Sequence, residues 1–345
     1  MRTIMEMNSL ERCYIIAEIG VNHAGSIDLA YKMIDEAKKS GADAVKFQTF
    51  KASTLVGKNT PKVSYQMSTT ENDESHFEMI NSLEFKYEDH KPVFDYCEKK
   101  GIDFISTPYD IESAIFLDNL GVQIFKTASA DIVDLPLHRI LASTRKSVII
   151  STGMATLGEI EEVLAIYACE DITKVSLLHC VANYPCSYQS LNLNVLKTLK
   201  RVFNRPVGFS DHAIGPYPAV AAITLGAQIV EKHFTLDKNM PGPDHKASST
   251  PEEFAQLVKA IRIAEISLGS CVKLIQNEEA EMRAISRKSL YFTKNITKGA
   301  IINESDLALR RPGSGIYANA LPVIIGKKAT KDLQSGMELQ YGDFE

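Results

Sequence analysis

The sequence has no long hydrophobic run and little excess of charge, and each absence excludes a class of protein. Within the 345 residues no apolar run reaches the roughly 18–20 residues that a membrane-spanning helix needs, so we expect no integral membrane protein. The 38 Lys+Arg and 43 Asp+Glu leave a formal net charge of −5, which disfavours nucleic-acid binding through a general basic surface. A hydrophobic content of 45% excludes intrinsic disorder.

The cysteines form neither the paired motifs nor the spacings that indicate disulfides or zinc sites. None of the six cysteines forms a CxxC pair, and the spacing of Cys180 and Cys186 fits no common zinc motif. We therefore expect free thiols and a cytoplasmic protein. Charged residues interrupt the apolar ones throughout residues 1–20, so we expect no secretory signal there.

Short β-branched runs recur along the first 235 residues and predict eight strands. The runs begin at Tyr14, Ala44, Asp103, Gln123, Val148, Val175, Val207 and Ile229. Stretches with helical periodicity lie between most of them, and alternating strands and helices indicate parallel βαβ units. Eight such units in ~250 residues predict an α/β fold of the (β/α)8 TIM-barrel type. No GxGxxG or P-loop pattern follows any strand, which disfavours a nucleotide-binding sheet.

Two of the predicted helices carry clear signals. In residues 26–39 the apolar side chains of Leu29, Met33, Ile34 and Ala37 share one stripe. After the last strand, Thr250 and Glu253 predict a capping box with Pro251 at the first helical position. The apolar face of that helix is expected to consist of Phe254, Leu257, Val258, Ile261 and Leu268.

The chain is expected to contain two domains. The barrel would occupy residues 1–269. A charged and irregular linker would occupy residues 270–285, and a small, mostly β domain would occupy residues 286–345. In that small domain the runs SLYFTKNI, AIINESDLALRRPGSGI and VIIGKKATKDL read as strand-like. The long segment from Lys51 to Glu84 is expected to be either a lid over the barrel or a surface insertion.

Polar residues gather at the C-terminal ends of the predicted strands, where TIM barrels carry their sites. Lys46 and Lys126, together with Ser129 and Ser151, suit a phosphate or a phosphate plus a carboxylate.

Two histidines, His212 and His233, end neighbouring strands. They suit a metal such as Zn, Mn, Fe or Co, which a carboxylate such as Glu18 could join. His179 lies in an apolar run and is expected to be structural.

Several long motifs resemble one family in order and over nearly the whole chain. They are AEIGVNHAGS, GADAVKFQTF, FISTPYD, STGMATLGEIEE, GFSDHAIG, VEKHFTLDKNMPGPDHKAS and RRPGSGI. The chain resembles the bacterial sialic acid (N-acetylneuraminate) synthases, together with the related legionaminic and pseudaminic acid synthases. The resemblance implies a TIM barrel followed by an antifreeze-like (SAF) domain. It also implies condensation of phosphoenolpyruvate with an N-acylated mannosamine.

The resemblance also implies roles for individual residues. The phosphoenolpyruvate cradle would consist of Lys46, Thr107, Lys126, Ser129, Ser151 and Ser210. The sugar would face Glu18, Gln48, Tyr184 and Asp244. His212 and His233 would hold a divalent metal, with Mn2+ first and Mg2+ or Co2+ as alternatives. Glu18 or Asp131 would be the carboxylate that assists the addition of water.

Arg311, by the same resemblance, would reach the site of a partner subunit in a domain-swapped homodimer. The motif RRPGSG places this arginine beside a rigid proline and two glycines, which suits a projecting tip.

Two positions depart from the family pattern. Ala182 stands where a polar residue is common, and Asp131 replaces a glutamate.

The resemblance leaves the acceptor sugar open. N-acetylmannosamine, giving N-acetylneuraminate, is the first expectation, and 2,4-diacetamido-2,4,6-trideoxymannose, giving N,N'-diacetyllegionaminate, is the alternative. Pseudaminate synthesis is less favoured. A barrel that condenses phosphoenolpyruvate with a phosphorylated aldose is a further enzyme reading, which the small C-terminal domain disfavours. Outside the enzymes, the alternative is a saccharide- or ice-binding protein, which the polar residues at the strand ends disfavour.

Overall fold

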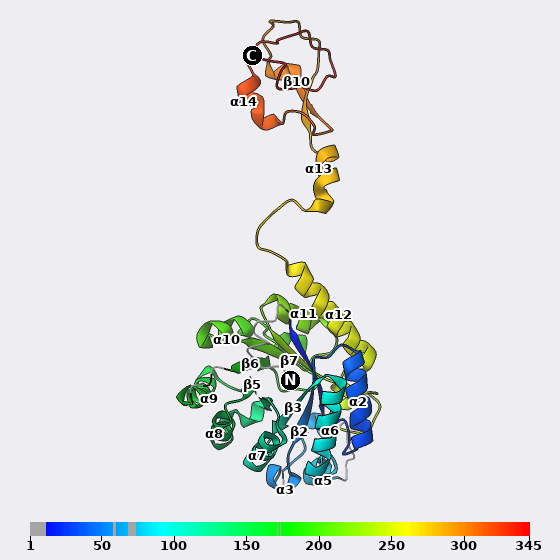
Figure 1. Cartoon of the computed structure of the whole chain (residues 1–345), viewed down its shortest axis with the longest axis vertical. Helices are drawn as coiled ribbons and strands as arrows, with labels where there is room; N and C mark the ends of the chain where they lie inside the picture. The colour runs from blue at the N-terminus through cyan, green and yellow to red at the C-terminus, as the bar shows by residue number, and fades with distance from the viewer. Residues whose placement is uncertain (1–11, 58–59, 68–73, 171, 173) are drawn as a thin grey trace. The chain divides into compact units, whose positions relative to one another are not determined.

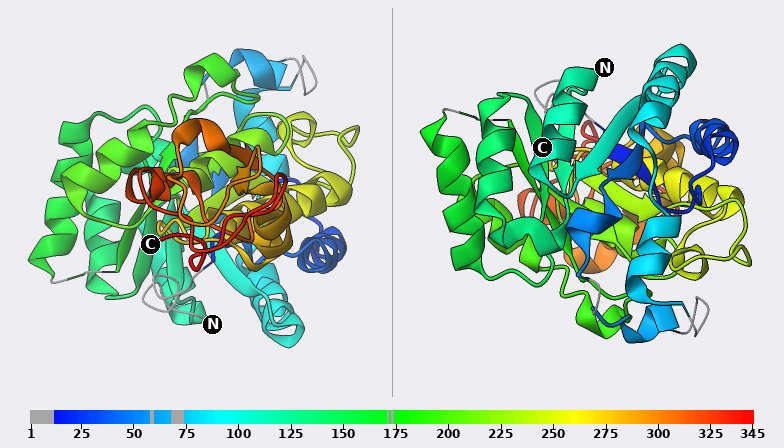
Figure 2. Two further views of the ribbon diagram at one scale, coloured as in Figure 1. Left: turned by 90° about the horizontal axis from the view of Figure 1, so that it is seen from above. Right: turned by 90° about the horizontal axis from the view of Figure 1, so that it is seen from below.

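The computed structural model describes residues 12–57, 60–67, 74–170, 172 and 174–345, and the chain divides after Gly269 into two compact units. In the first unit eight parallel strands close into a barrel in the order of the sequence, with helices outside the strands (Figures 1 and 2). The predicted (β/α)8 barrel is therefore confirmed. The segment for which we expect no secretory signal begins outside the described residues.

All eight predicted strands are present within a residue or two of their expected bounds. They are β1 (Tyr14–Gly20), β2 (Ala44–Thr49), β3 (Asp103–Pro108), β4 (Ile124–Thr127), β5 (Ser147–Ser151), β6 (Val175–Cys180), β7 (Val207–Asp211) and β8 (Ile229–His233). The barrel closes where β1 pairs with β8, and in this pairing Glu18 lies level with His233. On its other side β1 pairs with β2, which brings Glu18 level with Lys46.

The helices that cover the strands follow them in sequence. They are α2 (Ile27–Lys39), α6 (Tyr87–Lys100), α7 (Ile111–Leu120), α8 (Leu135–Ser143), α9 (Leu157–Cys169), α10 (Val195–Phe203), α11 (Tyr217–Thr224) and α12 (Pro251–Leu268). Three short helices interrupt the connection between β2 and α6, namely α3 (Ala52–Leu55), α4 (Ser64–Met67) and α5 (His76–Ser82).

Helix α12 shows how local sequence signals set these boundaries. Thr250 and Glu253 form the predicted capping box, and Pro251 is the first helical residue. Phe254, Leu257, Val258 and Ile261 are buried as expected. The prediction for Leu268 is wrong: the helix reaches its last turn there, and this side chain is 54% exposed.

Side chains inside the barrel form two layers, because alternate residues of each strand point to the same face. The lower layer is apolar and consists of Tyr14, Ile16, Ala44, Ile105, Ile124, Ile149, Leu178 and Ile229. The upper layer lies two residues nearer the C-terminal end of each strand, counted from Ile16 on β1 and from Gly208 on β7. It consists of Glu18, Lys46, Thr107, Lys126, Ser151, Cys180, Ser210 and Glu231. The interior therefore changes from apolar to polar toward the C-terminal ends of the strands.

Gly208 marks the place in this interior where β7 has no room for a side chain. A Cβ there would lie 2.5 Å from both the carbonyl oxygen of Ile229 and a methyl group of Leu178. Glycine is therefore required by the close approach of neighbouring strands.

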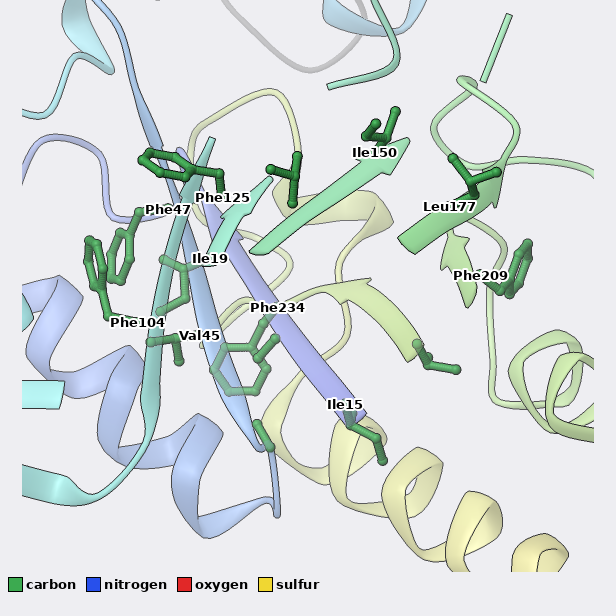
Figure 3. Close-up of a cluster of buried hydrophobic side chains, with 14 of the residues drawn as sticks. Ile15, Ile19, Val45, Phe47, Phe104, Phe125, Ile150, Leu177, Phe209 and Phe234 are labelled. Atoms are coloured by element: carbon green, nitrogen blue, oxygen red, sulfur yellow. The ribbon is translucent and has the colours of Figure 1, made fainter. Parts of the chain in front are cut away.

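The opposite faces of the strands pack against the helices. Ile15, Val45, Phe125, Ile150 and Phe209 belong to this outer cluster, which Figure 3 shows in close-up. The same cluster contains the buried residues of the covering helices, so it holds the helices onto the barrel.

The second unit has a core of its own. Its strands β9 (Ser289–Phe292) and β10 (Leu307–Arg310) pair antiparallel, and the core includes Leu290, Phe292, Ile302 and Leu333.

Two local expectations for the second unit need correction. The linker contains a helix, α13 (Ala280–Ser286), and the run from Val323 begins inside helix α14 (Leu321–Ile324) rather than in a strand. A leading proline, Pro322, and a short apolar turn make this helix possible where β-branched residues had indicated a strand.

No helix in the described part of the chain is long and apolar enough to cross a membrane.

Candidate active site

A cavity of about 520 Å³ opens at the C-terminal ends of the barrel strands. Its floor is the upper layer of the barrel interior, and all eight residues of that layer line it. Its size and position are those of a small-molecule site in a TIM barrel.

The two lysines of the upper layer are buried in ion pairs. The Nζ atom of Lys46 lies 2.7 Å from Oε2 of Glu18 and donates a hydrogen bond of 3.1 Å to Oγ1 of Thr107. The Nζ atom of Lys126 donates to Oγ of Ser151 at 2.6 Å and lies 3.8 Å from Oε1 of Glu231. Both lysines are thus preorganised and are compensated by buried carboxylates.

These charges shift one another's protonation. Burial raises the pKa of Glu18 to about 7, although Lys46 opposes the shift. Burial also favours the neutral form of Glu231, but Lys126 and Lys46 outweigh it and keep the pKa of this carboxyl below its usual value. Burial lowers the pKa of the Lys126 ammonium. Of the two glutamates, Glu18 is the one poised to exchange a proton near neutral pH.

Hydroxyl groups surround the lysines. Oγ of Ser129 accepts a hydrogen bond of 3.0 Å from the backbone N–H of Gly153 and lies 3.5 Å from Sγ of Cys180. A Cβ on Gly153 would lie 2.7 Å from that Oγ, so a side chain at this position would displace the serine. Oγ of Ser210 donates to Oε1 of Glu231 at 3.0 Å. Two cations among several hydroxyls can bind a small polyanion.

Two histidines stand at the edge of this floor. Their ring centroids lie 5.4 Å apart, and Tyr184 packs 4.1 Å from the ring of His212. Nδ1 of His212 donates a hydrogen bond of 2.8 Å to the carbonyl oxygen of Val181, so the neutral ring presents a lone pair at Nε2. Burial lowers the pKa of His212 to about 4 and holds the pKa of His233 well below its usual value, so both rings are neutral.

This donor set fits a divalent metal ion held by His212 and His233. Nδ1 of His233 is buried, has no hydrogen-bond partner among the described residues, and lies 3.8 Å from Oδ2 of Asp244. Within the described residues no group of three or more His, Cys, Asp or Glu side chains converges on one point. Other positions around an ion would therefore be filled by water or substrate.

Of the site residues that the sequence predicts in the first unit, the structure brings together all but one. Gln48 donates to Oε1 of Glu18 at 3.1 Å, and Asp244, whose pKa burial raises to about 6, also lines the cavity. The exception is Asp131.

Asp131 does not line the cavity. The turn η1 (Ser129–Val133) presents Ser129 and Ala130 there, whereas Asp131 is half-buried, and its Oδ2 is enclosed and has no hydrogen-bond partner among the described residues. The role of Asp131 in adding water stays a prediction, and its absence from the cavity lining favours Glu18. Arg311 belongs to the second unit, where its side chain is exposed after β10.

Glu231 is the main cavity residue for which the sequence predicts no role, although it is one of the polar residues at the strand ends. It lies two residues before His233 on β8, and that spacing places both side chains on the inner face. The alternation along β8 is the signal that could have identified it. Ala182 lines the cavity without offering a polar side chain. His179 is structural as expected, with a hydrogen bond of 2.6 Å between Nε2 and the Leu191 carbonyl.

The segment expected as a lid or surface insertion forms one wall of the cavity. Residues 58–59 and 68–73 of it lie outside the described residues. Helix α3 lies beside α5 (Figure 1). Leu55 and Ile80 join a small cluster with Val21, Phe50 and Leu83. We call Leu55, Val63, His76 and Ile80 the insertion wall; all four line the cavity.

Comparison with known proteins agrees with this architecture. The NeuB family matches residues 33–273, and the SAF domain matches residues 287–345. An N,N'-diacetyllegionaminic acid synthase of Campylobacter jejuni is 44% identical over 94% of this chain and 97% of its own length. A protein of the same name from Legionella pneumophila is 43% identical over 96% of this chain and 95% of its own length.

More distant relatives carry other names. The human N-acetylneuraminate-9-phosphate synthase is 34% identical over 86% of this chain and 83% of its own length. A crystal structure of an N-acetylneuraminic acid synthetase from Leptospira borgpetersenii, in complex with citrate, has a TM-score of 0.70 at 34% identity. It covers 79% of this chain and 90% of its own.

Proposed function

The chain belongs to the NeuB family and carries an SAF domain, and on this premise we propose that it is an N,N'-diacetyllegionaminate synthase. Family membership makes it a phosphoenolpyruvate-dependent condensing enzyme among the nonulosonic acid synthases. The finer proposal is carried by the 44% and 43% identity to two N,N'-diacetyllegionaminic acid synthases. These relatives support N,N'-diacetyllegionaminate, the alternative from the sequence, better than N-acetylneuraminate, because the N-acetylneuraminic acid synthetase of Leptospira borgpetersenii is only 34% identical.

We propose that the upper layer binds phosphoenolpyruvate. Lys46 and Lys126 would contact its phosphate and carboxylate, with hydroxyls from Thr107, Ser129, Ser151 and Ser210 completing the cradle. Because both lysines are held by neighbouring groups in the free site, they position the substrate more than they transfer protons.

The reaction joins C3 of phosphoenolpyruvate to the aldehyde carbon of 2,4-diacetamido-2,4,6-trideoxymannose, and water adds at C2. Glu18 would accept the proton of that water, a role suited to a carboxyl whose pKa burial raises to about 7. The aldehyde oxygen takes up a proton and becomes a hydroxyl group. The C2–O bond to the phosphate then breaks, phosphate leaves with the bonding electron pair, and the new hydroxyl at C2 loses its proton as the ketone forms. Gln48 would orient Glu18 through their 3.1 Å hydrogen bond.

A divalent ion held by His212 and His233, with Mn2+ first and Mg2+ or Co2+ as alternatives, would supply Lewis acidity that polarises the sugar aldehyde. Tyr184 packs on the ring of His212 and would limit its movement, while Asp244 would face the sugar.

We also propose that the active form is a homodimer in which Arg311 of one subunit serves the cavity of the other. Mixing Arg311→Ala with His233→Ala tests this. Each homodimer should be inactive, and co-refolded heterodimers should regain up to about half of the wild-type activity, because one site then keeps both residues. No recovery in verified heterodimers would contradict the exchange.

The direct test of the function is phosphate release from phosphoenolpyruvate with Mn2+ and each acceptor in turn, followed by mass spectrometry of the product. We expect N,N'-diacetyllegionaminate from 2,4-diacetamido-2,4,6-trideoxymannose, at a kcat/KM above that for N-acetylmannosamine. A preference for N-acetylmannosamine would restore N-acetylneuraminate as the product.

A further inference from the structure

The two sides of the cavity differ in chemistry. The upper layer offers charges and hydroxyls, which suffice for phosphoenolpyruvate and the reacting aldehyde. The insertion wall offers mainly aliphatic side chains, and phosphoenolpyruvate, a small trianion, has no group that they would stabilise. The part of the acceptor sugar that does not react is the remaining occupant for this side.

Val63 is 51% exposed although it lines the cavity. Leu55 and Ile80, by contrast, are partly buried against the cluster that anchors the wall. An aliphatic side chain left open inside a cavity gains stability when a ligand covers it with an apolar group. A methyl group of a ligand can be buried against this surface at no cost in hydrogen bonds, whereas a hydroxyl group placed there loses its hydrogen bonds to water.

His76 is the polar member of the insertion wall, and Thr60 and Gln66 of the same segment also line the cavity. Its Nδ1 is buried and has no hydrogen-bond partner among the described residues. Burial and the nearby Lys62 ammonium lower the pKa of His76, so the ring is neutral and offers one donor and one acceptor. An acylamino group carries both an N–H and a carbonyl oxygen, so it can form one hydrogen bond with the other ring nitrogen, Nε2, whether that nitrogen donates or accepts.

The wall is held in place before a ligand arrives. The capping box of α5, in which Ser75 and Glu78 satisfy each other's backbone N–H groups, fixes the turn that begins with His76. An ion pair of 3.2 Å between Lys62 and Glu74 ties the preceding segment to this turn, and the Lys62 side chain is 7% exposed. A preorganised wall can discriminate between sugars without first being ordered by them.

We propose that the insertion wall selects the acceptor by its non-reacting end, with His76 bonding a second acylamino group and Val63 packing against the 6-methyl group. This inference rests on the proposed function, because it presupposes an amino-sugar acceptor in the cavity. It assigns the choice between 2,4-diacetamido-2,4,6-trideoxymannose and N-acetylmannosamine to residues outside the barrel strands.

The test compares kcat/KM for these two sugars in three variants. Val63→Thr keeps the shape of the side chain at an exposed position and should lower the preference for the trideoxy sugar about 10-fold. His76→Phe should lower kcat/KM for the diacetamido sugar by roughly 2- to 10-fold through loss of one hydrogen bond, and should leave N-acetylmannosamine within about twofold. His76→Gln, which keeps a donor and an acceptor, should recover most of that loss.

Val133→Thr is the matched control, because Val133 is 66% exposed and does not line the cavity. In every variant KM for phosphoenolpyruvate and the melting temperature should match those of the wild type. Equal losses for both sugars, or an unchanged preference, would overturn the role of the wall while the wild-type preference still supports the proposed function. A wild-type protein that uses neither sugar would overturn the function itself.

Discussion

The eight strands build two layers inside the barrel, and one step of two residues along each strand separates them. Ile149 in the lower layer and Ser151 in the upper layer both belong to β5 and both point inward. The lower layer excludes water and packs, whereas the upper layer holds two lysines and two glutamates that must compensate one another. The same backbone therefore supports stability at one level and chemistry at the next, so changes in the two layers should have separable effects.

We expect the largest effect on turnover from the two histidines, of which His233 lies two residues beyond Glu231 on β8. Replacing His212 or His233 by alanine should lower turnover about 10³-fold, because the Lewis acidity that we propose is worth several kcal/mol in the transition state. Phosphate release before and after chelation, with Mn2+ added back, measures this, and calorimetry with Mn2+ measures binding directly. Full activity of either variant in metal-free buffer would remove the metal from the proposal.

The lower layer should respond in stability alone. Ile149→Ala deletes a fully buried side chain and should lower the free energy of unfolding by about 2–5 kcal/mol, with kcat and KM within about twofold. Ser151→Ala on the same strand is the matched variant. It should lower activity with little loss of stability, since it removes one of the hydrogen-bond acceptors of Lys126. Denaturant unfolding and steady-state kinetics on both proteins test the separation, and a joint loss of stability and activity in each would contradict it.

The next largest effect is expected from replacing the lysines of the upper layer. Lys46→Met and Lys126→Met should each raise KM for phosphoenolpyruvate by roughly 10- to 150-fold, because a hydrogen bond to a charged group is worth about 1.5–3 kcal/mol. Lys146→Met is the control, since this lysine pairs with Asp118 and does not line the cavity. Unchanged kcat and KM in both upper-layer variants would place the anion elsewhere.

The smallest expected effect separates Asp131 from Glu18. Burial raises the pKa of Asp131 to about 7 in the folded protein, so the folded state binds its proton more tightly than the unfolded chain. Its contribution to stability is complete at acid pH and is lost as pH rises from about 4 to about 7. Asp131→Asn should therefore be about 1 kcal/mol more stable than wild type at pH 8, after allowance for solvent screening, and should flatten this dependence.

Activity distinguishes the same two carboxylates. Glu18→Gln should abolish the rise of kcat/KM through about pH 7, whereas Asp131→Asn should leave that limb intact. Loss of the limb in Asp131→Asn would return this residue to the list of candidate bases.

Much of the fold could be predicted because its signals are local. The β-branched runs set the eight strands, and Thr250, Pro251 and Glu253 set the start of α12. The site was predictable in so far as polar residues end the strands, as Lys46 and Lys126 do. The rest depended on three-dimensional context: the turn η1 places Ser129 at the cavity and Asp131 outside its lining, and α14 forms where β-branched residues favoured a strand.

The small cluster beneath the insertion wall has an evolutionary consequence. Phe50, Met79 and Leu83 pack in a group separate from the core between strands and helices. The backbone N–H of Ala52 donates a hydrogen bond of 2.8 Å to Oε2 of Glu84, near the other end of the segment. Val21, Phe50 and Tyr109 contribute to this cluster from outside the segment. The sequence of the segment can therefore change with little effect on the core between strands and helices, provided that its contacts with these three residues are kept. Grafting a relative's segment between β2 and α6, together with matching residues at these three positions, is a route to a new product from the same catalytic floor.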